Sequence, residues 1–163
     1  MSNAVAQHGM LLRALEDHEA QADDARFRDL CFHHLPHVRE NQRMLEEYQS
    51  QLGAVVGTAE KILGAAFGAV RDLADAARES DFLRLMGDIA MARQAEDTFK
   101  TFREAGRMMG NRTLQEIGDV GERHQDAYVR EANRLVQHLF VECTQGINGG
   151  ARKSTSAHLE ANP

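Results

Sequence analysis

Four polar residues lie at matching heights in the two halves of the chain, and together they could bind a metal. His8 lies about 15 residues before a break at 23–24, and a count of about 15 residues after that break reaches 38–39, which His37 and Asn41 flank. Glu96 lies about 14 residues before a second break at 110–111, and His124 about 14 residues after it. At roughly 1.5 Å per helical residue, each lies about 20 Å from its turn. Imidazole and carboxylate groups suit Fe, Mn or Zn, so the spacing predicts metal ligands at His8, His37, Glu96 and His124.

The same periodicity leaves other interpretations open. Three further residues could take the inward positions: Glu19, His34 and Glu131. Asn41 flanks the level of His37, and Glu122 would be a spare or outer carboxylate beside His124. A buried histidine often makes only a hydrogen bond, and Glu96 could pair with Arg93 instead. A polar layer without a metal is therefore the competing prediction.

Two other groups in the sequence are candidate sites. The run His33-His34-Leu35-Pro36-His37 resembles a surface metal-binding patch, but such a run is more often divided between core and solvent. Cys31 is predicted to be a small apolar core residue, because no pairing of a cysteine with a histidine can be inferred.

Helical periodicity must position these groups. It predicts helices over 4–21, 25–52, 81–109 and from about 113, which form two antiparallel hairpins. Asp23 or Asp24, Ser80, and Thr113 with Glu116 are the expected starts. A kink or restart is expected at Pro36. A crossover helix over 59–77 would join the hairpins into a four-helix bundle spanning 4–145, with a flexible tail at 146–163.

The apolar stripe of each helix should face the bundle interior. The stripes are Val5, His8, Leu12, Leu15, Glu19 and Ala22; Phe27, Cys31, His34, Val38, Asn41, Leu45, Tyr48 and Leu52; Phe82, Met86, Ile89, Glu96, Phe99 and Phe102; and Leu114, Ile117, Gly121, His124, Tyr128, Glu131 and Leu135.

Composition agrees with one all-α domain. The 163 residues are 42% hydrophobic and 27% charged, with two prolines and no tryptophan. A net charge of −6 argues against nucleic-acid binding, which needs a basic face. No apolar run is long enough to cross a membrane, and residues 1–20 are too polar for a signal peptide. The two cysteines are far apart, so a reduced, cytoplasmic setting is expected.

Several local phrases resemble a known family. Asp24-Ala-Arg-Phe-Arg-Asp-Leu, then His34-Leu35, Arg43-Met-Leu-Glu-Glu and Leu52-Gly53, resemble a second-helix phrase. Phe67-Gly-Ala-Val-Arg-Asp-Leu, Thr98-Phe-Lys-Thr-Phe and Met109-Gly-Asn resemble the third-helix region and its turn. Over most of 5–140 the chain is similar to the ferritin-like family of stress-associated bacterial proteins typified by YciE and YciF. The resemblance implies a ferritin-like four-helix bundle with a di-metal site.

The metal motif of that family is not preserved. His8 falls where a first-helix Glu is expected, and Pro36 and His37 stand where acidic residues would be. Asn41 takes the approximate place of the second-helix His. On the third helix, one alignment places Glu96 and Phe99 at the ligand positions and another places Ala92 and Ala95 there. Glu122 or His124 falls in the region of the last pair.

Two functions follow as hypotheses. The favoured one is a helical bundle that needs no metal or cofactor and acts as a homodimer through an exposed apolar helix face. The alternative is a metal-binding oxidoreductase or peroxide-handling protein, in which Fe, Mn or Zn is held by a histidine-rich variant of the site. No residue pattern requires a catalytic role.

Overall fold

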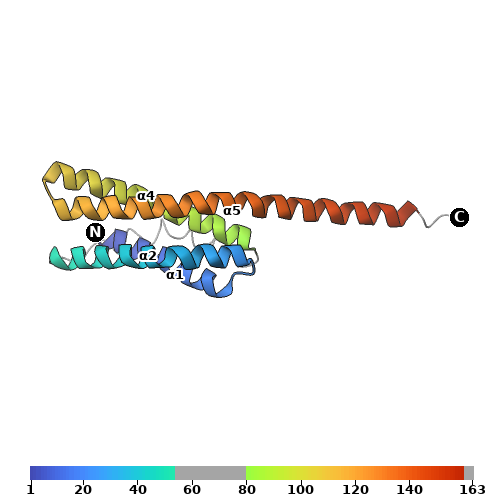
Figure 1. The fold of residues 1–163 in the computed structure, drawn as a ribbon, viewed down its shortest axis with the longest axis horizontal. Helices are drawn as coiled ribbons and strands as arrows, with labels where there is room; N and C mark the ends of the chain where they lie inside the picture. Colours follow the sequence, from blue (N-terminus) through green and yellow to red (C-terminus); the bar gives the residue numbers. More distant parts are fainter. Residues whose placement is uncertain (54–79, 160–163) are drawn as a thin grey trace.

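The computed structural model describes residues 1–53 and 80–159, with side chains as far as Glu142 and at Thr144. Over these ranges it consists of four helices and no strands: α1 (Ser2–Gln21), α2 (Ala25–Gln51), α4 (Asp81–Met109) and α5 (Arg112–Leu159) (Figure 1). The all-α prediction is confirmed. The crossover helix expected over 59–77 lies outside the described residues.

The helices form two antiparallel hairpins packed into a bundle. Helix α1 packs on α2 and α4, and α5 packs on α4 and α2. At one end, the Asp24 amide donates to Asp81 Oδ2 at 2.6 Å, which joins the first turn to the start of α4. At the other end, Asn111 Nδ2 donates to Tyr48 Oη at 2.8 Å, which joins the second turn to the end of α2. The end of α2 and the start of α4 therefore lie at opposite ends of the bundle, as a crossover connection requires.

The helix starts agree only in part with the expected caps. Asp24 caps α2, since its Oδ1 accepts from the amides of Arg26 and Phe27 at 2.8 and 3.4 Å. Ser80 is the N-cap residue of α4 but makes no side-chain cap bond. The cap of α5 is Asn111 rather than Thr113, because Asn111 Oδ1 accepts from the Leu114 amide at 3.0 Å. The helix therefore begins earlier than the sequence predicted, and its free amide at Leu114 is bound by Asn111.

The helix ends follow the sequence closely. Gly53 and Gly110 have φ of 63° and 64°, the left-handed conformation that glycine adopts without strain after a helix. Helix α2 continues unbroken through Pro36, so no restart occurs there.

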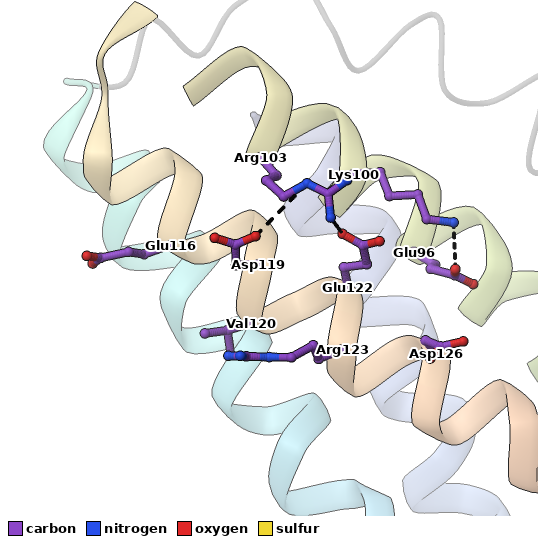
Figure 2. Close-up of a pocket in the computed structure, with 9 residues that line it drawn as sticks. All are labelled: Glu96, Lys100, Arg103, Glu116, Asp119, Val120, Glu122, Arg123 and Asp126. Carbon is purple, nitrogen blue, oxygen red and sulfur yellow. Dashed lines mark hydrogen bonds and ion pairs between the residues drawn. The ribbon is translucent and has the colours of Figure 1, made fainter. Parts of the chain in front are cut away.

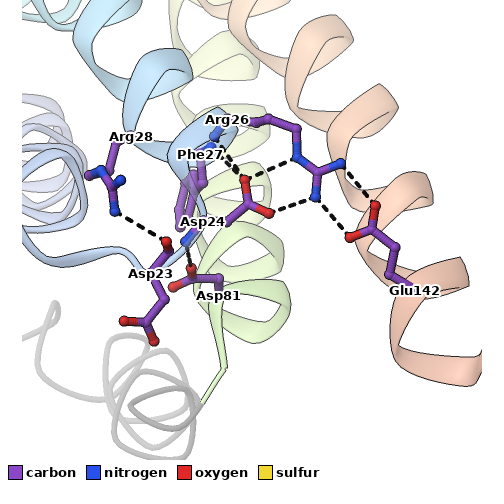
Figure 3. A network of polar contacts seen from close by, with 7 residues as sticks. All are labelled: Asp23, Asp24, Arg26, Phe27, Arg28, Asp81 and Glu142. Atoms are coloured by element: carbon purple, nitrogen blue, oxygen red, sulfur yellow. Dashed lines mark hydrogen bonds and ion pairs between the residues drawn. The ribbon is translucent and has the colours of Figure 1, made fainter. Parts of the chain in front are cut away.

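An ion-pair network extends from the first turn to α5 (Figure 3). Arg26 Nη2 lies 2.6 Å from Asp24 Oδ2 and 2.8 Å from Glu142 Oε2. Arg26 and Glu142 are exposed, so the net stabilisation from these ion pairs is small.

The core agrees best with the sequence on α2, where seven of the eight stripe residues are buried and only Leu52 is exposed. On α4 the stripe is shifted, because Leu85, Asp88, Ala92 and Ala95 are buried whereas Met86 is 43% exposed. On α5 the stripe residue Glu131 is exposed. Gln125 is fully buried there, although the stripe omitted it.

Three glycines allow α4 and α5 to pack closely. A Cβ placed on Gly106, Gly118 or Gly121 would lie 2.3–2.4 Å from atoms of the other helix. Side chains at these positions would hold the two helices apart.

Helix α5 extends beyond the rest of the bundle (Figure 1). Its backbone stays helical to Leu159, where the sequence predicted an irregular tail from Gly146. A helix that is already nucleated gains one hydrogen bond for each added residue, so glycines weaken it without stopping it. None of the helices in the described ranges is long and apolar enough to cross a membrane.

Candidate metal centre

His8 has both ring nitrogens engaged by neighbouring side chains. Gln125 Nε2 donates to His8 Nε2 at 3.1 Å, so His8 Nδ1 carries the proton and donates to Gln42 Oε1 at 3.0 Å. The side chain is buried, and burial lowers the pKa of His8 to about 4, although the bond to Gln42 opposes this shift. His8 is therefore a neutral, hydrogen-bonded core residue with no nitrogen free to bind a metal.

Glu96 is likewise occupied. Figure 2 shows it beside Lys100 in an open groove of about 780 Å³ between α4 and α5. Its carboxylate accepts from Lys100 Nζ at 2.6 Å and from Arg93 Nη1 at 2.9 Å. Burial raises the pKa of Glu96, but these two cations outweigh burial and hold it below the ordinary value. Two cations on one carboxylate leave little charge for a metal. Glu122, predicted as a spare or outer carboxylate, pairs with Arg103 in the same groove.

The other two predicted ligands lie together. The rings of His37 on α2 and His124 on α5 have centroids 4.4 Å apart and an interplanar angle of 33°. Glu40, one turn after His37, completes the group. Each of the three residues offers a ligand atom within 4.8 Å of the other two. Among the described residues this is the one such cluster of three or more potential ligands, and His8 and Glu96 do not belong to it.

The geometry requires only a small adjustment to bind a metal. Bonds of about 2.0–2.2 Å in a tetrahedral site place ligand atoms about 3.4 Å apart. His37 and Glu40 are exposed, so their side chains can move inward by rotation while His124 stays half-buried. Two imidazoles and one carboxylate fill three positions and leave at least one open for water or another ligand.

The protonation state of His124 also favours a metal. Burial and the neighbouring His37 lower the pKa of His124 below its ordinary value. The ring is therefore neutral at pH 7, as a metal ligand must be.

His124 is held by a buried amide. Its Nδ1 lies 2.9 Å from Oδ1 of Asn41, a side chain with no exposed surface. Asn41 was predicted to replace a ligand of the ferritin-like motif. In the structure it bonds a ligand candidate instead.

The sequence missed Glu40, although a signal was present. His37 and Glu40 are three residues apart on a helix, the spacing that places two side chains on one face. The run at 33–37 is divided between core and solvent, as the more ordinary interpretation predicted. His33 is exposed and bonds the Asp29 carbonyl at 2.6 Å, whereas His34 is buried.

A second polar group was also missed. Asp88 is fully buried on α4, and its Oδ2 lies 2.8 Å from His18 Nδ1. Tyr128 Oη donates to the same oxygen at 3.4 Å. Burial raises the pKa of Asp88, and the bonds to His18 and Tyr128 partly offset it. The sequence contained a signal for this residue. Leu85, Ala92 and Phe99 recur every seven residues, and Asp88, three residues after Leu85, falls on the same buried face of the helix.

Comparisons with protein-family models, with curated proteins and with solved structures give no match. What this chain binds must therefore be inferred from its own geometry.

Proposed function

We propose that this protein is a ferritin-like helical bundle that binds one divalent transition metal through His37, Glu40 and His124. The observation that carries the proposal is the close approach of three potential ligands from two different helices. Two nitrogens and one oxygen suit Zn²⁺, Fe²⁺ or Mn²⁺. An open position on such a metal can take up water, O₂ or peroxide, which is the chemistry expected of the oxidoreductase alternative.

A carboxylate-bridged pair of metals fits the described residues less well. Such a site takes a Glu from each of two helices and a Glu-x-x-His pair from each of the others. The corresponding interior here holds His8, Asn41 and Gln125, all in hydrogen bonds with other side chains. The buried acids Asp88 and Glu96 are paired with His18 and with two cations. We therefore propose a single metal at the edge of the bundle in place of the di-metal centre that the resemblance implies.

Calorimetric titration with Zn²⁺, and the visible spectrum with Co²⁺, test the proposal on chelator-free protein. We expect one metal per chain. His37→Gln and Glu40→Gln should each weaken it by about 100-fold or more, because a direct ligand matters more than an outer group worth 10–100-fold. Both residues are exposed, so neither substitution should disturb the fold.

His33→Gln is the matched control, since His33 is an exposed histidine one turn away on the same helix. Metal affinity should be unchanged in this variant. Weak binding by the wild-type protein, or equal losses in the control and in His37→Gln, would refute the assigned ligands. Retention of the metal by a His37→Gln/Glu40→Gln double variant would do the same.

The favoured hypothesis from the sequence, a homodimer, is supported by a separate observation. Phe140 is 56% exposed with its ring 6.0 Å from that of Phe82, and Met86 and Val141 are 43% and 49% exposed. This patch of exposed apolar side chains at the start of α4 and on α5, with Phe82 and Phe140 in ring contact, fits a second copy of the chain, because a two-fold dimer brings identical surfaces together.

Sedimentation velocity over a concentration series tests the dimer. We expect a concentration-dependent dimer that Phe140→Ser abolishes. Met108→Ser is the control, because Met108 is 76% exposed near the end of α4, at the opposite end of that helix from Phe82 and Met86. A monomer at every concentration would exclude this candidate.

A further inference from the structure

Asn41 is the neighbour that decides which nitrogen of His124 is available. Its side chain is fully buried, so water does not compete for its oxygen. Oδ1 can only accept a hydrogen bond, so the Nδ1 atom 2.9 Å away must carry the proton. A neutral imidazole has one N–H, so the lone pair of His124 then lies on Nε2.

We propose that Asn41 is a positioning residue for the metal centre, which holds His124 in the Nδ1–H tautomer and presents Nε2 as the ligand atom. This inference rests on the proposed metal site. An imidazole whose second nitrogen is bonded to an oxygen is the arrangement that fixes ring orientation in metal sites. Asn41 follows Glu40 directly on α2. The same turn of α2 therefore supplies both the proposed ligand Glu40 and the residue that orients the proposed ligand His124.

The kind of group that accepts the hydrogen bond from His124 affects how tightly the site would bind a metal. A carboxylate would make the ring a stronger donor, whereas a neutral amide orients the ring without adding charge. Asn41 Nδ2 is buried and has no hydrogen-bond partner among the described residues. A buried donor without a partner costs free energy of folding, and packing does not explain why an amide stands here. Orientation of His124 accounts for that cost.

The test uses three full-length variants. Asn41→Leu removes the acceptor at similar volume, Asn41→Asp keeps an acceptor, and Gln42→Leu is the control. Gln42 is adjacent and bonds His8 instead, so its loss removes a comparable buried hydrogen bond without touching His124.

Two readouts separate this inference from the proposed function. In metal-free protein, long-range ¹H–¹⁵N NMR should show His124 as the Nδ1–H tautomer in the wild type, in Asn41→Asp and in Gln42→Leu. Asn41→Leu should shift toward the Nε2–H form that free imidazoles favour. In Zn²⁺ titrations, Asn41→Leu should bind 10–100-fold more weakly, Asn41→Asp at least as tightly as the wild type, and Gln42→Leu unchanged.

A wild-type His124 in the Nε2–H form would overturn the role of Asn41, whatever the metal does. An unchanged affinity in Asn41→Leu would overturn it too. If the wild type shows the Nδ1–H tautomer but binds no Zn²⁺, the proposed metal function is refuted, while the selection of the tautomer by Asn41 is supported.

Discussion

Gly118 should tolerate no side chain, because α4 and α5 touch there through their backbones. A Cβ at this position would lie 2.3 Å from the Arg103 amide nitrogen and 2.6 Å from the Phe99 carbonyl oxygen. Ordinary contacts begin near 3.4 Å, so the helices would have to separate by about 1 Å. A gap of 0.5–1 Å forfeits a quarter to a half of the attraction between facing atoms.

The expected cost can be measured against a glycine in open space. Alanine gains about 1 kcal/mol over glycine in a helix, and overpacking costs about 1–3 kcal/mol or more. Gly118→Ala should therefore lower the free energy of unfolding by about 2 kcal/mol, since backbone atoms cannot rotate away. At Gly87 a Cβ would meet nothing within 4 Å, so Gly87→Ala should raise it by about 1 kcal/mol.

Urea unfolding followed by far-ultraviolet circular dichroism measures both variants under the same conditions. Equal m-values would show that the comparison is of stability alone. A Gly118→Ala protein as stable as Gly87→Ala would refute the close contact of α4 and α5, and with it the position of every residue near the second turn.

Three further predictions concern buried groups. The free energy of unfolding should fall by up to about 3 kcal/mol as the pH drops from 6.5 toward 4, because His8 binds a proton in the unfolded chain but not in the folded core. A pH series of urea unfolding curves measures this fall, and His8→Gln should reduce it. An unchanged pH dependence in this variant would contradict the prediction. His18→Phe should lower the free energy of unfolding by about 3 kcal/mol at pH 7, because it leaves the Asp88 carboxylate without its partner His18. The loss should be smaller at lower pH, since the raised pKa of Asp88 means that the folded protein binds the proton more readily than the unfolded chain. A loss of stability that stays the same on acidification would refute this. In a Cys143→Ser background, Cys31 should react with a thiol reagent only on unfolding, because its side chain is fully buried and burial raises its pKa. Rapid labelling of the native protein would show that Cys31 is accessible.

Much of the fold could be predicted because helical periodicity is strong where large apolar residues line one face. Helix α2 shows this, with Phe27, Val38 and Leu45 all buried as expected. On α4 the same method selected Phe82 and Met86, which are large, but Phe82 is only partly buried and Met86 is exposed. The buried face there holds Ala92 and Ala95, small residues that close packing favours and hydrophobicity does not emphasise.

The sequence predicts how far along the bundle axis each candidate residue lies, but not on which face of its helix the side chain lies. Rise per residue placed His37 and His124 at one level, and the structure brings them together. A one-residue error turns a side chain by about 100° around the helix, so height alone cannot separate Glu96 from its neighbours. The pairing of Glu96 with Arg93, three residues before it, was expected as an alternative, and the i,i+4 pair with Lys100 could have been anticipated from the sequence in the same way.

The contrast between His8 and His124 shows how the bundle assigns different roles to one residue type. Amides hold both: Gln42 and Gln125 occupy two nitrogens of His8, and Asn41 occupies one of His124. A ring with both nitrogens bonded inside the core can only bridge helices. A half-buried ring with one nitrogen bonded keeps the other free of that bond, and the ring of His124 lies beside His37 and an exposed carboxylate. The number of amide partners, together with burial, therefore separates the structural histidine from the proposed ligand.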